Sequence, residues 1–95
     1  MRLETTTDEL GNIYEEYFEG LHLQRRVDKT PSGQVVGTID YTRNSAGQCL
    51  GWVWKDGDGV VVRRFEVRRE AEKPAKLLEY DKDEVLLQTH DWDQD

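Results

Sequence analysis

The chain has 95 residues, of which 36% are hydrophobic and 35% are charged, and its formal net charge is −7. This length fits one domain, expected over residues 1–95, with a small core and a heavily charged surface. The single cysteine, Cys49, excludes an internal disulfide framework and a multi-cysteine zinc site, so we expect a reducing, cytoplasmic setting. We expect neither a signal peptide nor a membrane span, because no apolar run approaches the roughly 18 residues that a span needs.

Charge is distributed unevenly along the chain. Residues 1–19 carry six acids and one base, residues 20–78 carry seven acids and eleven bases, and residues 79–95 carry seven acids and one base. Two acidic ends therefore flank a basic middle. Such a pattern bears on the partners of a protein and not on its fold.

Residues 7–19 have the pattern of an amphipathic helix. Thr6 and Glu9 have the spacing of a capping box, which satisfies free backbone N–H groups at a helix start. The apolar residues recur on one helical face, at Leu10, Ile13, Tyr14, Tyr17 and Phe18. Gly20 suits a C-terminal cap. We therefore predict a helix whose outer face is acidic.

From Leu21 onward apolar and polar residues alternate, and turn residues recur between the alternating segments. This pattern predicts strands at residues 21–28, 34–42, 49–55 and 60–68, and a C-terminal hairpin over residues 76–90. With loops at residues 29–33, 44–47 and 57–58, one sheet face would carry Leu21, Leu23, Val27, Val35, Ile39, Tyr41, Leu50, Trp52, Trp54, Val61, Phe65 and Val67. The expected fold class is α+β, with the N-terminal amphipathic helix packed on a four- to six-stranded antiparallel β-meander.

The sequence predicts no catalytic residue, no cofactor and no metal site. Nucleophilic catalysis needs Ser or Cys beside a base, and the context of Cys49 provides none. The glycines fall at turns and form no phosphate-binding loop. The Asp-rich segments at residues 56–59 and 91–95 lack the spacing of an EF-hand, so we predict a hairpin turn and a solvated tail.

Carboxylates are the candidate functional groups. We expect a non-catalytic module that binds a protein partner with a basic surface, because closely spaced carboxylates can imitate the charge of a nucleic-acid backbone. Inhibitors encoded by phages and mobile elements are similar in size and charge. The candidate partner-binding residues are Asp8, Glu15, Glu16, Glu19, Glu79, Asp81, Asp83 and Glu84. A solvated helix face without a function is the simpler interpretation of the same pattern.

Three other functions stay open. Direct nucleic-acid binding through a basic sheet face is the weaker alternative, given the negative net charge, and its candidate residues are Arg26, Lys55, Arg64 and Arg68. A small ligand could bind beneath the helix, around Trp52, Trp54 and Tyr17. Self-association, for instance as a homodimer, could use a free sheet edge.

One fragment resembles a known family. Residues 34–38, Gln-Val-Val-Gly-Thr, are similar to the Gln-Val-Val-Ala-Gly inhibitory hairpin of cystatins, and a helix followed by a four-stranded meander resembles the cystatin fold. The resemblance implies inhibition of cysteine proteases. The predicted register instead places the fragment within a strand, where Gly37 would relieve crowding against Arg25 and Trp54.

Overall fold

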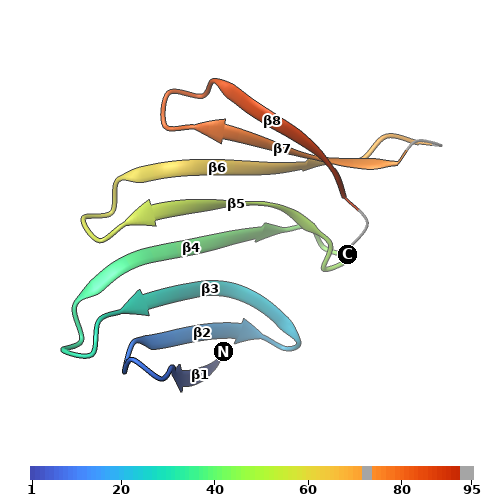
Figure 1. Ribbon diagram of the computed structural model, residues 1–95. Coiled ribbons are helices and arrows are strands. Elements are labelled where there is room, and N and C mark those ends of the chain that lie inside the picture. Colours follow the sequence, from blue (N-terminus) through green and yellow to red (C-terminus); the bar gives the residue numbers. More distant parts are fainter. Residues whose placement is uncertain (72–73, 93–95) are drawn as a thin grey trace.

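The computed structural model describes residues 1–71 and 74–92, which form one open antiparallel sheet of eight strands in chain order (Figure 1). The strands are β1 (Arg2–Thr7), β2 (Ile13–Glu19), β3 (His22–Lys29), β4 (Val35–Arg43), β5 (Cys49–Asp56), β6 (Val61–Arg68), β7 (Ala75–Asp81) and β8 (Leu86–Trp92). The described residues contain no helix, and hence no helix of the length and apolarity that a membrane crossing requires. The predicted α+β fold class is therefore wrong, and the fold is all-β.

The helix predicted over residues 7–19 is replaced by the first β-hairpin. Gly11 has a φ of 86°, and its N–H donates to the carbonyl of Asp8 at 3.1 Å, which closes a loop between β1 and β2. Leu10, expected on the buried helix face, is 81% exposed in this loop. The remaining apolar residues of the segment are β-branched or aromatic and favour a strand. The described residues therefore also lack the helix-and-meander arrangement of the cystatins.

The later strands lie close to their predicted positions. The segments 21–28, 34–42, 49–55 and 60–68 coincide with β3 to β6, and the hairpin at 76–90 coincides with β7 and β8. Directly opposed residues of neighbouring strands share a sheet face. One continuous row of opposed residues crosses β1 to β7 and consists of Glu4, Glu16, Arg26, Ile39, Trp54, Arg63 and Asp81.

The face that carries this row is here named the aromatic face. Strand alternation and pairing also place on it Tyr14, Phe18, Tyr41, Trp52, Phe65, Val67 and Trp92. The opposite face, here named the ion-paired face, carries Tyr17, Arg25, Asp40, Val53, Arg64 and Tyr80 in another opposed row. The predicted grouping of Ile39, Tyr41, Trp52, Trp54, Phe65 and Val67 on one face is confirmed.

Bulges move other residues to the face opposite the predicted one. Register shifts after Asp28 and after Trp54 leave Val35 opposite Lys29 and Val61 opposite Lys55, on the ion-paired face. Val27 lies there too, opposite Thr38. Arg26, expected on the polar face, belongs instead to the aromatic row. A shift of one residue turns a side chain to the other face, so each unpredicted bulge reversed part of the assignment.

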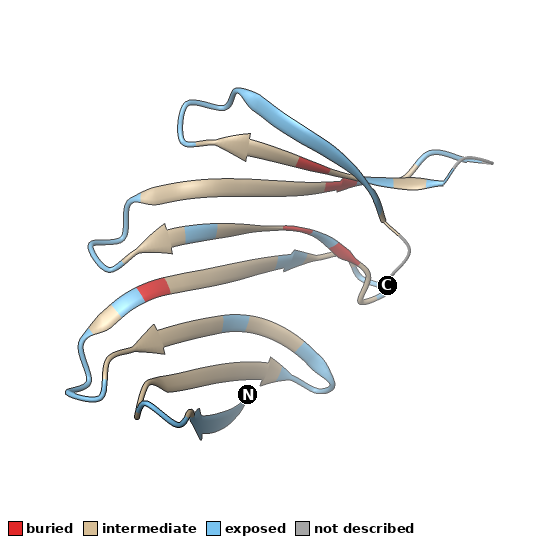
Figure 2. Cartoon of the chain, viewed as in Figure 1, coloured by how far each residue is buried: buried red, intermediate tan, exposed pale blue. Residues whose placement is uncertain are grey.

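Few side chains are buried in this sheet (Figure 2), and the buried hydrophobic ones are Cys49, Val67 and Leu78. Aromatic side chains form one packed group: Trp52 stacks on Phe65 with ring centroids 4.9 Å apart, and Tyr41 and Trp92 approach the same indole at 5.9 and 5.7 Å. Trp92 and Trp52 are three strands apart, about 14 Å in a flat sheet. The sheet is therefore not flat here: the end of β8 bends over β7 and β6 (Figure 1), and the contact between the two indoles ties β8 to β5.

Candidate functional site

Five hairpin loops of the sheet share one design. In each loop the fourth residue donates its N–H to the carbonyl of the first residue at 2.9–3.2 Å, and the fourth residue has a φ between 64° and 92°. The first residues are Asp8, Thr30, Asn44, Asp56 and Asp81. The fourth residues are Gly11, Gly33, Gly47, Gly59 and Glu84. A left-handed backbone at the fourth position explains why glycine occupies it in four of the five loops.

The first side chain of each loop accepts hydrogen bonds from the loop backbone. In the four loops that begin with Asp or Asn, the Oδ1 atom accepts N–H groups from the residues two and four positions later at 2.8–3.0 Å. In the remaining loop the Thr30 hydroxyl accepts the N–H of Gln34 at 3.1 Å. The N–H groups of a turn lack the partners that a neighbouring strand provides. A short polar side chain at the first position accepts hydrogen bonds from these N–H groups instead.

Four of these loops lie at the same end of the sheet. Because the strands are antiparallel and in chain order, the β1–β2, β3–β4, β5–β6 and β7–β8 connections share one end, at the left in Figure 1. These loops and their flanking strand ends carry seven carboxylates, here named the acidic rim: Asp8, Glu9, Asp56, Asp58, Asp81, Asp83 and Glu84. The same segments carry two bases, Lys82 and Lys29, and Lys29 is paired with Glu15 of β2 at 2.9 Å.

The rim carboxylates have two different roles. Asp8, Asp56 and Asp81 hold their loops through the hydrogen bonds described above. Glu9, Asp58 and Asp83 are exposed, and their carboxylates accept none of the loop hydrogen bonds. Glu84 differs from both groups, since it accepts a bidentate contact from Arg64, the shorter distance being 2.6 Å. Only part of the rim charge is therefore used to build the loops.

Asp8 is held in its charged form by its neighbours. The Tyr14 hydroxyl donates to the Oδ2 atom of Asp8 at 2.8 Å and the Asn12 side-chain amide donates to it at 3.1 Å. These hydrogen bonds, led by that of Tyr14, lower the pKa of the Asp8 carboxyl, and the same Tyr14 contact raises the pKa of the phenol. The rim therefore keeps this negative charge at neutral pH.

The structure divides the predicted acidic residues. Asp8, Asp81, Asp83 and Glu84 lie in the acidic rim, whereas the other four do not. Glu15, Glu16 and Glu19 belong to β2, where neighbouring residues point to opposite faces, so no acidic helix face exists. Glu79 lies on the aromatic face near Arg63 at 3.5 Å and His90 at 3.8 Å.

Sequence reasoning missed three members of the rim: Glu9, Asp56 and Asp58. The signal that identifies them is the spacing of a short polar residue and a glycine three positions later, repeated at residues 8–11, 30–33, 44–47 and 56–59. The first of these four occurrences was assigned to a helix, which hid the repetition.

The predicted basic residues do not all lie on one face. Arg26 lies on the aromatic face, whereas Lys55, Arg64 and Arg68 lie on the ion-paired face. Each of the four predicted bases has a carboxylate partner, and the pairs are Arg26 with Asp28 (2.7 Å), Lys55 with Asp40 (3.7 Å), Arg64 with Glu84 (2.6 Å) and Arg68 with Glu66 (2.8 Å). This arrangement leaves little positive charge for a phosphate backbone.

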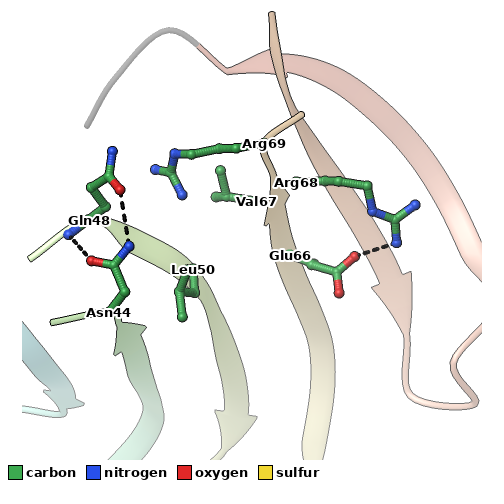
Figure 3. Close-up of a pocket in the computed structure, with 7 residues that line it drawn as sticks. All are labelled: Asn44, Gln48, Leu50, Glu66, Val67, Arg68 and Arg69. Carbon is green, nitrogen blue, oxygen red and sulfur yellow. Dashed lines mark hydrogen bonds and ion pairs between the residues drawn. The ribbon is translucent and has the colours of Figure 1, made fainter. Parts of the chain in front are cut away.

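A depression with a volume of about 570 Å³ lies near the end opposite the rim (Figure 3). Its lining consists of Asn44, Gln48, Leu50, Glu66, Val67, Arg68 and Arg69. Most of its polar side chains engage one another or the backbone. Asn44 donates to the side chain of Gln48 at 3.0 Å, and Arg69 donates to the carbonyl of Cys49 at 2.7 Å.

The ligand site predicted around Trp52, Trp54 and Tyr17 is not assembled. Tyr17 lies opposite Arg25 on the ion-paired face, whereas both tryptophans lie on the aromatic face. Cys49 is buried, and its thiol donates to the carbonyl of Gly51 at 3.7 Å. Within residues 1–71 and 74–92, no cluster of three or more His, Cys, Asp or Glu side chains could hold a metal ion.

Comparisons with protein-family models, with curated proteins and with solved structures give no match to this chain.

Proposed function

We propose that this chain is a non-catalytic protein-binding module whose acidic rim binds a basic groove on a nucleic-acid-binding protein. The observation that carries this proposal is the gathering of seven carboxylates at one end of the sheet, with two bases in the same segments. A cytoplasmic setting belongs to the proposal, because nucleic-acid-binding partners are encountered there and the lone cysteine suits a reducing compartment.

The spacing of the rim charge supports a comparison with one polynucleotide strand. The first and last rim loops are six strand spacings apart, or about 29 Å in a flat sheet. Because Glu84 is paired with Arg64, six rim carboxylates remain over this length, or about one charge every 5 Å. A single strand of B-DNA carries one charge every 3.4 Å or so, and a duplex has about twice that density. The rim is therefore closer in charge density to a single strand than to a duplex.

Rigid presentation also supports the proposal. Each rim loop is closed by backbone hydrogen bonds and by its first side chain, so the exposed carboxylates start from defined positions. A charged surface that is already ordered loses less conformational entropy when it binds.

The test compares two triple variants in affinity capture from a lysate of the source organism or its host. The rim variant carries Glu9→Gln, Asp58→Asn and Asp83→Asn, which removes three exposed charges and leaves the loop-holding residues intact. The control variant carries Glu4→Gln, Glu16→Gln and Glu19→Gln, which removes the same charge from β1 and β2.

We expect the wild-type protein and the control variant to capture the same nucleic-acid-binding protein at low salt, and the rim variant to lose it. Capture by the wild-type protein should weaken as salt rises, because screening reduces attraction between exposed charges. Equal loss in both variants would show that only net charge matters. Equal retention in both would show that the rim is not the binding surface, and either result would overturn the proposal.

A further inference from the structure

The two edge strands of the sheet, β1 and β8, are both uncovered. Among the described strands β1 pairs only with β2, and β8 pairs only with β7. Every residue of β1 is exposed, and so is every residue of β8 except Trp92. Native edge strands are usually blunted by charged side chains, especially lysine, by proline or by a covering element. Neither strand contains lysine or proline, and their charged residues are Arg2 and Glu4 in β1 and Asp91 in β8.

We propose that copies of this chain pair head to tail, with β8 of one copy adding to β1 of the next. In an eight-stranded antiparallel sheet the first and last strands run in opposite directions. The β1 strand of a second copy can therefore continue the antiparallel order beside β8 without reversing the molecule. The contact is heterologous, because each copy uses a different edge for each neighbour.

One register of this pairing matches both the faces and the charges. It places His90 opposite Glu4 of the neighbouring copy and Trp92 opposite Arg2 of the neighbouring copy, all on the aromatic face. An imidazole then meets a carboxylate, which can accept a hydrogen bond from an imidazole N–H. Glu4 and His90 are 53% and 46% exposed in a single copy, so both side chains are accessible to a neighbour.

The same register places Thr89 opposite Thr5 of the neighbouring copy, on the other face. Threonines opposed across strands form a favourable and uncharged pair. No two like charges are opposed between β8 and the neighbouring β1 in this register. Self-association in this register therefore joins two free edges and opposes compatible side chains on both faces.

Head-to-tail addition also has a structural consequence. Because the chain direction is preserved, the acidic rims of successive copies lie at the same end of one extended sheet. This inference does not depend on the proposed function of the rim, and either can hold without the other.

The test measures average mass against protein concentration by sedimentation equilibrium for the wild-type protein and two double variants. One variant, Thr5→Lys/Thr89→Lys, opposes two lysines at every junction. The matched variant, Thr5→Lys/Thr89→Glu, opposes a lysine and a glutamate at the same junction and differs from the first at one residue. Circular dichroism checks that both variants keep the sheet.

We expect the wild-type mass to rise with concentration, and the Lys/Glu variant to associate at least as well. The Lys/Lys variant should associate about tenfold more weakly, because like charges directly opposed across strands repel. A wild-type protein that stays monomeric would overturn the proposal. Equal weakening of both variants would also overturn it, because that result is expected if β1 pairs with β1. Equal association of both variants and the wild type would overturn it too, because the contact would then lie elsewhere.

Discussion

At the scale of single residues, the first and fourth positions of the hairpin loops account for much of the local structure. The first residue supplies an oxygen that gathers backbone N–H groups, and the fourth residue supplies a left-handed backbone. Four loops use glycine at the fourth position, and the β7–β8 loop uses Glu84 with a φ of 64°. A side chain in this conformation costs about 1–2 kcal/mol relative to glycine.

This strain makes Glu84 a site where glycine should be favourable. Glu84→Gly and Glu84→Ala both remove the ion pair with Arg64, but only glycine also relieves the backbone. We expect the glycine variant to unfold in urea with a free energy about 1 kcal/mol higher than the alanine variant. An alanine variant that is as stable as the glycine variant would show that the loop does not hold a left-handed residue at this position.

At the scale of elements, the aromatic cluster around Trp52 substitutes for a second layer. The sheet has no helix or second sheet on its aromatic face among residues 1–71 and 74–92, so its packing comes from side chains that reach across strands. Trp52 contacts rings from β4, β6 and β8. Trp54, two residues later on the same face, is 43% exposed.

The two tryptophans therefore provide a matched comparison. We expect Trp52→Ala to lower the free energy of unfolding by about 2 kcal/mol or more, because it removes the centre of the aromatic cluster. Trp54→Ala should lower it by about 1 kcal/mol or less, since much of that side chain remains in water. Urea unfolding followed by circular dichroism measures both values, and equal losses would contradict the central position of Trp52.

Alternation along the chain was enough to locate most strands of this sheet, because a period of two persists from His22 to Arg68. It failed at residues 7–19, where Ile13, Tyr14, Tyr17 and Phe18 fit a helical spacing as well as a strand that is half buried on both faces. Over a segment of only seven residues, the spacing of the apolar residues does not distinguish a helix from such a strand.

Bulges were the second limit on prediction. Pairing is shifted in five of the seven strand pairs, and each shift reverses the faces beyond it. The acidic rim was only half predictable for a different reason. Its carboxylates are separated by up to 76 positions in the sequence, between Asp8 and Glu84, and only the correct strand count brings their loops to one end.

At the scale of the whole molecule, the chain order of the strands determines the charge layout. Eight antiparallel strands in chain order have four connections at one end of the sheet and three at the other. Three of the four connections carry the acidic rim. With flanking strand ends counted in the same way, the described residues at the other end carry two acids, Glu19 and Glu70, and three bases, Arg43, Arg68 and Arg69. Had residues 7–19 formed a helix, the β1–β2 loop and its two carboxylates would not have joined the acidic rim.

The most direct test of the account is an NMR titration of the ¹⁵N-labelled protein with an oligoarginine peptide, which reports where negative potential is concentrated. We expect the largest amide shifts at the β1–β2, β5–β6 and β7–β8 loops, which carry the rim carboxylates, led by Glu9, Asp58 and Asp83. Small shifts are expected at Gly20, Leu21 and the loop from Asn44 to Gln48, at the other end of the sheet. Shifts centred on Glu15, Glu16 and Glu19, or spread evenly over both ends, would contradict the existence of an acidic rim.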